Sequence, residues 1–389
     1  MSYPQFNSFG PLISQTHLEI RDNLLRFAEQ QLAPGAAARD QTHQFPQDQI
    51  DELAALGGMA MKVPVDMGGP GIDNVSYALC IEALSRYDAS VAVVAVASNL
   101  SAHILANHAS AEQQSRWVAP AAQGKLGALS FALTEPSAGS DAAGIRTTAQ
   151  ASGDEWILNG SKQWITGGSN ARLFVVFVKT PLPNAPQAMT CFGVEAGTTG
   201  FSIGRVEDKM GLRSSGTAQL FFDDCRISSR QIIGKPGEGL KVALGSISAS
   251  RVAIAAQSIG IAERAFELGL DYARERTAFG QSLSQFQNSR FVLADCRTEL
   301  DQAWLLMLRA AHMLDADQNI RGEASMAKLA ASETCCRVVD RMLQLHGGNG
   351  YSREYEIERL YRDARVMRIF EGTSEIQREV ISRDLLDSK

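Results

Sequence analysis

The feature that most constrains the fold of this 389-residue chain is a change of hydrophobic periodicity at two points. From Thr16 to about Trp117, and again after Gly237, apolar residues recur at the spacing of an amphipathic helix. Between about Leu126 and Ile233, short apolar runs alternate with turn-forming clusters, which is the pattern of strands. The sequence therefore predicts a helical domain over residues 1–125, a β domain over 126–236 and a second helical domain over 237–389.

Both flanking domains are predicted to consist of capped helices with short links. In the first domain, Pro34 and Gly35 are expected to end the first helix, and helices are expected over residues 16–32, 46–58, 75–86, 89–106 and 111–117. In the last domain, helices are expected over residues 237–274, 283–315, 322–345, 353–364 and 374–386. Long helices joined in this way are typical of a four-helix bundle, which we predict for the last domain.

The middle domain is predicted to be an antiparallel sandwich or barrel, because its strands are short and closely spaced. Strands are expected over residues 128–133, 155–158, 173–178, 189–194 and 219–222. The dinucleotide motif Gly-x-Gly-x-x-Gly does not follow any of them, so a Rossmann domain is not supported.

Composition excludes several classes of protein. The net charge is -6 and no basic block occurs, so we expect no nucleic-acid partner. The six cysteines lack CxxC spacing, which argues against a disulfide framework or a metal site and favours a reducing compartment. Residues 1–7 lack the features of a signal peptide, and the longest apolar run, Val91–Ala97, is too short for a membrane span. We therefore expect a cytoplasmic protein without a membrane span or a bound metal.

Glu371 is the first candidate for chemistry. It follows the apolar pair Ile369 and Phe370 and precedes Gly372. Ser374 and Gln377 have the spacing of a capping box, which predicts a helix starting at Ser374. One interpretation is a surface glutamate that complements the positive end of this helix. The other is a carboxylate in an apolar pocket, tuned as a general base.

Two stretches of the β domain are candidate ligand loops. Phe131–Asp141 begins as a strand and ends in small residues with several hydroxyl groups, so its backbone can approach a flat or anionic ligand. In Lys162–Gly168, Trp164 and Thr166 are two residues apart and are predicted to lie on one side of a strand. The alternatives are an ordinary polar turn and a core tryptophan.

Two further candidates lie in the last domain. Arg276, at the end of a long helix, can neutralise a phosphate or simply complement the helix dipole. The glycines of Gln344–Gly350 are suited to a helix end or to close approach of a ligand. His346 is interpreted as mainly structural, because no acid or cysteine has the spacing of a catalytic dyad.

In this order, these stretches resemble the acyl-CoA dehydrogenase family, and the resemblance covers essentially the whole chain. It is carried by six segments: Leu133–Asp141, Trp164–Thr166, Glu207–Arg213, Arg276–Gly280, Gln344–Gly350 and Phe370–Arg378. The amino-acid sequences of the segments around 207–213 and 223–227 are most similar to those of short-chain or short-branched-chain members. The resemblance implies a helical domain, a β domain and a helical bundle, in agreement with the pattern of the residues.

The resemblance implies FAD as cofactor and a homotetramer, a dimer of dimers, in which subunits share FAD sites. The residues it assigns to FAD are Phe131, Leu133, Thr134, Gly139, Ser140, Trp164, Ile165, Thr166, Arg276, Phe279, Gln287, Gln344, Leu345, Gly347, Gly348, Thr373 and Glu375. Those it assigns to the acyl-CoA substrate are Ser140, Ser248, Arg251 and Gly372.

Glu371 matches the family's catalytic base, which removes a proton from Cα while a hydride leaves Cβ for flavin N5. The product is a trans-2-enoyl-CoA, and electrons pass to an electron-transfer flavoprotein. Two positions depart from relatives: Ser250 stands where some members place the base, and Ser248 where short-chain members often have Asp. The alternatives are an acyl-CoA oxidase, a dehydrogenase of carrier-protein thioesters, and a non-catalytic helical binding protein.

Overall fold

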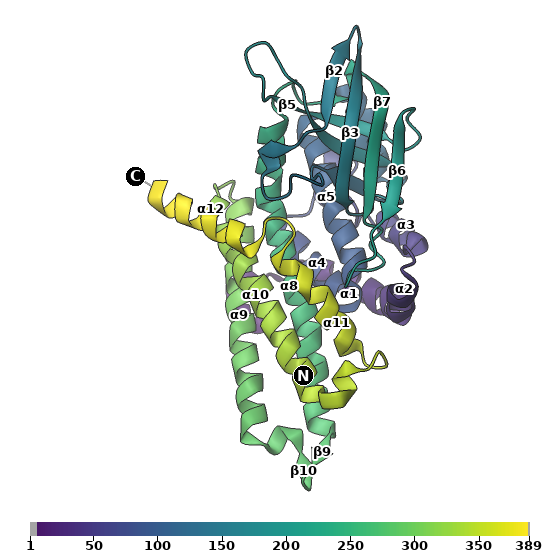
Figure 1. Cartoon of the computed structure of the whole chain (residues 1–389). Helices are drawn as coiled ribbons and strands as arrows, with labels where there is room; N and C mark the ends of the chain where they lie inside the picture. Colours follow the sequence, from purple (N-terminus) through teal and green to yellow (C-terminus); the bar gives the residue numbers. More distant parts are fainter. Residues whose placement is uncertain (1–5, 388–389) are drawn as a thin grey trace.

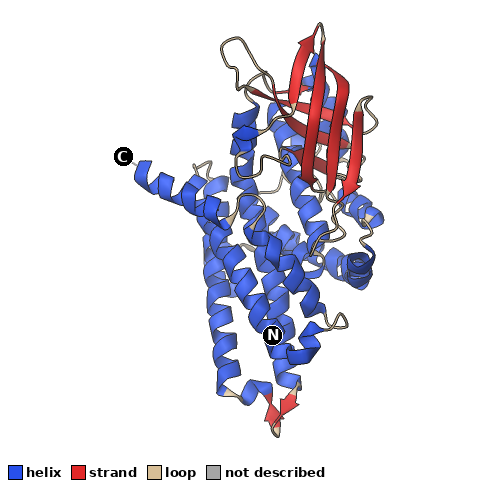
Figure 2. Cartoon of the chain, viewed as in Figure 1, coloured by secondary structure: helices blue, strands red, loops and turns tan. Residues whose placement is uncertain are grey.

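The computed structural model describes residues 6–387. The prediction that the N-terminus lacks a signal peptide concerns residues 1–7, of which Met1–Gln5 lie outside the described residues. Helices, a β-sheet and helices again follow one another along the chain, as the periodicity predicts (Figures 1 and 2). The sheet lies at one end of the molecule and the long C-terminal helices extend away from it (Figure 1).

From residue 6 onward, the N-terminal region consists of helices joined by turns and loops. Its elements are η1 (Phe6–Leu12), α1 (Gln15–Phe27), η2 (Ala28–Leu32), η3 (Ala33–Gly35), α2 (Ala36–Thr42), α3 (Gln47–Ala55), η4 (Val65–Met67), α4 (Asn74–Tyr87), α5 (Ala89–His108), α6 (Ala111–Gln113), η5 (Gln114–Val118) and α7 (Ala119–Ala122).

The prediction that Pro34 and Gly35 end the first helical stretch is wrong. Pro34 occupies the first turn of η3, where the backbone N–H that proline lacks is not needed for a helical hydrogen bond. The chain therefore continues into α2. The stretch ends instead at Thr42, where His43 adopts a left-handed conformation with φ 59°.

The middle region forms one sheet in the order β6-β7-β3-β2-β4-β5-β8, with β1 paired to β4. Its strands are β1 (Leu129–Ala132), β2 (Thr148–Ser152), β3 (Glu155–Ile165), β4 (Leu173–Lys179), β5 (Met189–Glu195), β6 (Phe201–Val206), β7 (Ala218–Ser228) and β8 (Ile232–Ile233), with the short helices η6 (Ala142–Gly144) and η7 (Ser229–Gln231). Aromatic rings of β4 and β6, and of β3 and β5, meet in its interior at centroid distances of 4.9 and 5.7 Å. The sheet thus folds around a core of its own.

The sheet is not antiparallel throughout, which corrects the prediction. β4 pairs in parallel with β1 and, at one residue, with β2. The polar strands β2 and β6 and the two-residue β8 were not predicted, since they lack the apolar runs that mark β4 and β5.

The C-terminal region contains α8 (Gly239–Glu275), α9 (Gln287–Asp315), α10 (Arg321–His346), α11 (Glu356–Ala364) and α12 (Ser374–Asp387). Between them lie β9 (Thr277–Ala278), β10 (Gln281–Ser282), η8 (Leu283–Gln285), η9 (Gly347–Tyr351) and η10 (Arg365–Arg368). Helices α8–α11 form the predicted bundle, and α12 projects from it beside α10 (Figure 1).

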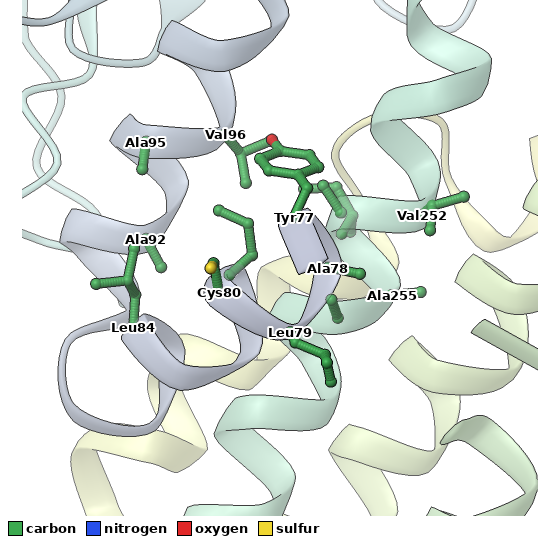
Figure 3. Close-up of a cluster of buried hydrophobic side chains, with 14 of the residues drawn as sticks. Tyr77, Ala78, Leu79, Cys80, Leu84, Ala92, Ala95, Val96, Val252 and Ala255 are labelled. Carbon is green, nitrogen blue, oxygen red and sulfur yellow. The ribbon is translucent and has the colours of Figure 1, made fainter. Parts of the chain in front are cut away.

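Helix α8 joins this bundle to the N-terminal helices. A Cβ atom on Gly260 of α8 would lie 2.3 Å from the backbone oxygen of Glu82 in α4, so only glycine permits this approach. Helices α4, α5 and α8 share a buried apolar cluster (Figure 3). By length and composition α5 and α8 are apolar enough to cross a membrane, but both are mostly buried, as expected of core helices.

Candidate active site

Glu371 lies in the short loop between η10 and α12, in a left-handed conformation with φ 53°. Gly372 follows with φ 91°. This conformation costs a non-glycine residue about 1–2 kcal/mol, so surrounding contacts must hold it. Lys328 of α10 donates to the Gly372 carbonyl at 2.8 Å, and the Gln377 amide donates to the carbonyls of Glu371 and Gly372. The loop is therefore fixed from two helices.

The capping prediction for α12 is only partly correct. The helix starts at Ser374, but Thr373 caps it, because the Thr373 hydroxyl accepts from the backbone N–H of Ile376. Ser374 donates its hydroxyl to Glu333 instead, and Gln377 holds the Glu371 loop. The side chains predicted to cap the helix thus anchor the candidate base.

The Glu371 carboxylate is desolvated. Its Oε2 atom is buried and has no hydrogen-bond partner. Burial raises the pKa of Glu371 above its usual 4.5, although the charges of Arg251 and Lys328 act in the opposite direction. Arg251 is only 8% exposed and donates to Ser325 at 3.1 Å. These properties contradict the interpretation of Glu371 as a solvated surface residue.

The two candidate loops of the β domain lie against each other. The Gln163 backbone N–H donates to the Thr134 carbonyl at 3.0 Å, and the Ser130 hydroxyl donates to the Thr166 carbonyl at 2.7 Å. The buried ammonium of Lys162 donates to Glu135 at 2.7 Å and to the Leu133 carbonyl at 3.1 Å. Glu135 also accepts from the backbone of residues 146 and 147. An ion pair in the sheet therefore fixes the shape of both loops.

Trp164 departs from its predicted geometry. Its φ is 61°, the register of β3 shifts between Lys162 and Ile165, and Thr166 lies beyond the end of the strand. The simple alternation that placed Trp164 and Thr166 on one side does not apply. Trp164 is also not a core residue, since 54% of it is exposed. The strained backbone holds an indole out from the sheet, where a flat ligand can stack on it.

A second group of predicted residues lies at the opposite end of the molecule. Arg276, Phe279 and Gln287 are exposed around the β9–β10 hairpin, far from the sheet (Figure 1). Gln344, Gly347 and Gly348 are exposed at the end of α10, where His346 stacks on Tyr272 of α8 at 4.3 Å. Within a single chain, these six residues therefore lie far from Trp164 and Glu371.

His346 has the structural role that its spacing predicts. It is buried, its Nδ1 pairs with the Met342 carbonyl at 2.8 Å, and burial lowers its pKa below 6.5.

Comparison with known proteins identifies the family. The acyl-CoA dehydrogenase N-terminal, middle and C-terminal domains match residues 14–125, 130–225 and 237–386. The chain belongs to the acyl-CoA dehydrogenase family. It is therefore an oxidoreductase of acyl-CoA, and its family consists of flavoproteins.

Several relatives of this acyl-CoA dehydrogenase are similar over nearly their whole length. The mitochondrial short-chain specific acyl-CoA dehydrogenase of Mus musculus is 42% identical, over 97% of this chain and 91% of the relative. The structure of butyryl-CoA dehydrogenase from Megasphaera elsdenii has a TM-score of 0.93 at 35% identity, over 96% and 99% of the two chains. A chain from a structure on the electron transferring flavoprotein of Acidaminococcus fermentans has a TM-score of 0.94 at 38% identity, over 96% and 98%.

The residues assigned to the flavin of the acyl-CoA dehydrogenase suit such a ligand. Phe131, Thr134 and Thr166 are half-buried, Leu133 and Ile165 are buried, and Gly139 and Ser140 are exposed beside them. Additional Cβ atoms on Gly139, Gly347 and Gly348 would meet no protein atom within 4 Å. The backbone is therefore accessible both in the loop of the β domain and at the end of α10. Leu345 and Thr373 are half-buried, and Glu375 is exposed.

Sequence reasoning missed Lys328 and Tyr77. Lys328 is fully buried beside Glu371, and burial lowers its pKa to about 8. Burial raises the pKa of Tyr77, and the charge of Glu371 raises it further. The sequence contains a signal for Lys328, since this lysine lies within the apolar stretch Met326–Ala331. An unpaired lysine rarely occupies a buried helix face, so its position indicates a specific role.

Proposed function

We propose that this protein oxidises short-chain acyl-CoA thioesters to trans-2-enoyl-CoA with bound FAD, and that Glu371 is the catalytic base. The observation that carries the base assignment is the buried, unpartnered Oε2 of Glu371. The names of the mouse and Megasphaera relatives support a short acyl group.

The chemistry requires a strong, positioned base. A proton α to a thioester is a weak acid, so its removal is favoured by a carboxylate whose pKa is raised by burial. The left-handed backbone at Glu371 and Gly372 directs this carboxylate, and Lys328 and Gln377 hold that backbone through hydrogen bonds to its carbonyl groups. FAD, when bound, accepts the hydride that leaves Cβ.

FAD is proposed to bind between two subunits of a homotetramer. The Trp164 loop would hold one end of FAD, and the partner's β9–β10 hairpin the other. The exposure of Phe279, 96%, supports this arrangement, because a large aromatic residue at a hairpin tip is costly to leave in water. Ser140, Ser248, Arg251 and Gly372 are proposed to contact acyl-CoA, and electron-transfer flavoprotein is proposed as the electron acceptor.

Replacing Phe279 with Asp is expected to reduce both FAD occupancy and assembly. The charge would be buried against the cofactor or the partner subunit without a counterion. Light scattering and the ratio of flavin to protein absorbance measure the two effects. Phe221→Asp on β7 is the matched control, since Phe221 is also exposed but is not assigned to FAD. Equal FAD content in both variants would contradict the shared site.

The rate of flavin reduction is expected to rise with pH through the raised pKa of Glu371, because only the carboxylate accepts the proton. Lys328→Gln removes a charge that lowers this pKa and keeps a hydrogen-bond donor. The pH profile should therefore move to higher pH, as measured by stopped-flow absorbance. Arg383→Gln, on the exposed face of α12, should leave the profile unchanged. An unchanged profile would show that Lys328 does not act on Glu371.

Anaerobic titration with acyl-CoAs of increasing length tests the proposed reaction. Bleaching of the flavin by butyryl-CoA is the expected result, and a yellow protein that no acyl-CoA bleaches would contradict it. Rapid hydrogen peroxide formation in air would indicate an oxidase in place of transfer to electron-transfer flavoprotein.

A further inference from the structure

One carboxylate of α10 contacts both ends of the loop that carries Glu371, where the chain passes from η10 to α12. The Ser374 hydroxyl, at the start of α12, donates to Oε1 of Glu333 at 2.7 Å. The Nε atom of Arg368, at the end of η10, lies 3.0 Å from Oε2 of Glu333. Arg368 and Ser374 are three residues before and three residues after Glu371. Glu333 therefore connects the two ends of the loop, and Glu371 lies at its centre.

The two contacts of Glu333 differ in kind. Ser374 is 2% exposed, so little water is available to replace Glu333 as the acceptor for its hydroxyl. The Nε atom of Arg368 is buried but makes no aligned hydrogen bond, so its attraction to Glu333 is that of an ion pair. Arg378 of α12 lies farther from the same carboxylate, at 3.8 Å. Glu333 thus accepts a hydrogen bond from α12 and pairs with a charge of η10.

The loop requires such a support because its backbone is strained. Glu371 has a φ of 53°, and a left-handed glutamate persists only where surrounding contacts hold it. Gln377 holds the loop from α12, which directly follows it, and Lys328 of α10 contacts the loop at the Gly372 carbonyl. Neither contact fixes the position of η10 relative to α12. The contacts of Glu333 with Arg368 and Ser374 do so.

The positions of η10 and α12 decide where the Glu371 carboxylate points. Within the described residues, Oε2 of Glu371 has no hydrogen-bond partner that would orient it, so the backbone sets its direction. Thr373 and Glu375, which are assigned to FAD, are the neighbours of Ser374 in the sequence. The contact between Ser374 and Glu333 therefore places the base and the proposed FAD residues together.

We propose that Glu333 is a positioning residue for the catalytic base. By holding Arg368 and Ser374, it keeps the Glu371 carboxylate in line with the Cα proton of the substrate. A displacement of about 1 Å at a reacting group can lower a rate by about 100-fold, so such a support has a large effect on the reaction. This inference rests on the proposed function, in which Glu371 takes the proton and FAD takes the hydride.

Anaerobic stopped-flow reduction of the FAD-loaded enzyme by butyryl-CoA tests the proposal. Glu333→Ala is expected to lower the rate constant of flavin reduction by about 10- to 100-fold, because the base loses its alignment. Ser374→Ala removes one of the two contacts and should have a smaller effect in the same direction. The double variant should be no slower than Glu333→Ala, since Ser374 acts through Glu333. Glu333→Gln keeps an acceptor for Ser374 and should retain part of the rate.

A deuterium isotope effect separates positioning from stability. With butyryl-CoA deuterated at Cα, Glu333→Ala should show a larger isotope effect than the wild type, because a misaligned base slows proton transfer relative to the other steps. A variant that is only less stable would contain fewer active molecules. The amplitude of bleaching would then fall, while the rate constant and the isotope effect would not change.

Glu299→Ala is the matched control. Glu299 lies on α9 and pairs with Arg337 and Arg341 of α10, at 2.6 and 2.7 Å. Its side chain is 22% exposed and that of Glu333 is 18% exposed, so the two substitutions remove similar ion pairs from the same bundle. Only Glu333 holds the loop of Glu371, and the rate constant and isotope effect of Glu299→Ala should equal those of the wild type.

The contrary outcomes are distinct. If Glu333→Ala and Ser374→Ala reduce their flavin with the rate constant and isotope effect of the wild type, Glu333 has no positioning role and the proposed function stands. The same conclusion follows if the effects of the two substitutions multiply in the double variant, because the two residues then act independently. If butyryl-CoA and other acyl-CoAs fail to bleach the wild-type flavin, the proposed function fails and the role of Glu333 fails with it.

Discussion

Glu371→Gln is expected to leave FAD bound and to slow flavin reduction by acyl-CoA by about 10²–10⁴-fold, the usual contribution of a general base. Glutamine has nearly the same shape as glutamate but cannot accept the Cα proton. Because the Oε2 atom of Glu371 is buried without a partner, the substitution removes a poorly solvated charge and should not lower stability. Anaerobic stopped-flow absorbance with butyryl-CoA measures the rate, and the visible spectrum measures bound FAD.

The matched control for this prediction is Glu379→Gln. Glu379 lies on α12 and forms an exposed ion pair with Arg383, so its neutralisation should leave the rate unchanged. A Glu371→Gln enzyme that bleaches at the wild-type rate would mean that another group removes the proton. Loss of FAD from the variant would show instead that Glu371 supports the fold of the site.

Lys162→Met is expected to destabilise the middle domain by about 3–5 kcal/mol, because it leaves the buried carboxylate of Glu135 without its cation. It should also weaken FAD binding, since Lys162 and Glu135 fix the loops that carry Phe131–Ser140 and Trp164. Denaturant unfolding followed by tryptophan fluorescence measures stability, and flavin fluorescence on dilution measures FAD release.

The contrast is Arg226→Met, which breaks the exposed ion pair with Glu155 across β7 and β3. A surface pair of this kind contributes about 0–1 kcal/mol, so the two variants should differ clearly. Equal unfolding curves would contradict the role given to the buried pair. The pKa of Glu135 is lowered from 4.5, so its ionised form stabilises the fold above pH 4.5 and this contribution is lost as the pH falls below that value.

The local pattern of apolar and end-signal residues predicted most helices of this protein. It did not predict strand pairing or helix capping where these depend on residues distant in the sequence. Helices α4, α5 and α8–α12 were predicted within a few residues, because their apolar spacing and end signals are local. The parallel pairing of β1 with β4 was missed, since nothing in either strand specifies its neighbour. The cap of α12 was misassigned because Glu333 of α10 takes the Ser374 hydroxyl.

The sequence by itself determined the order of helices, sheet and helices, the family, and Glu371 as the candidate base, because periodicity and short motifs are local properties. Only the tertiary structure decided the electrostatic environment of Glu371, since Arg251 and Lys328 come from α8 and α10 and burial depends on packing. The acid strength of a carboxyl group depends on the charges and water around it in space, and sequence order does not specify these.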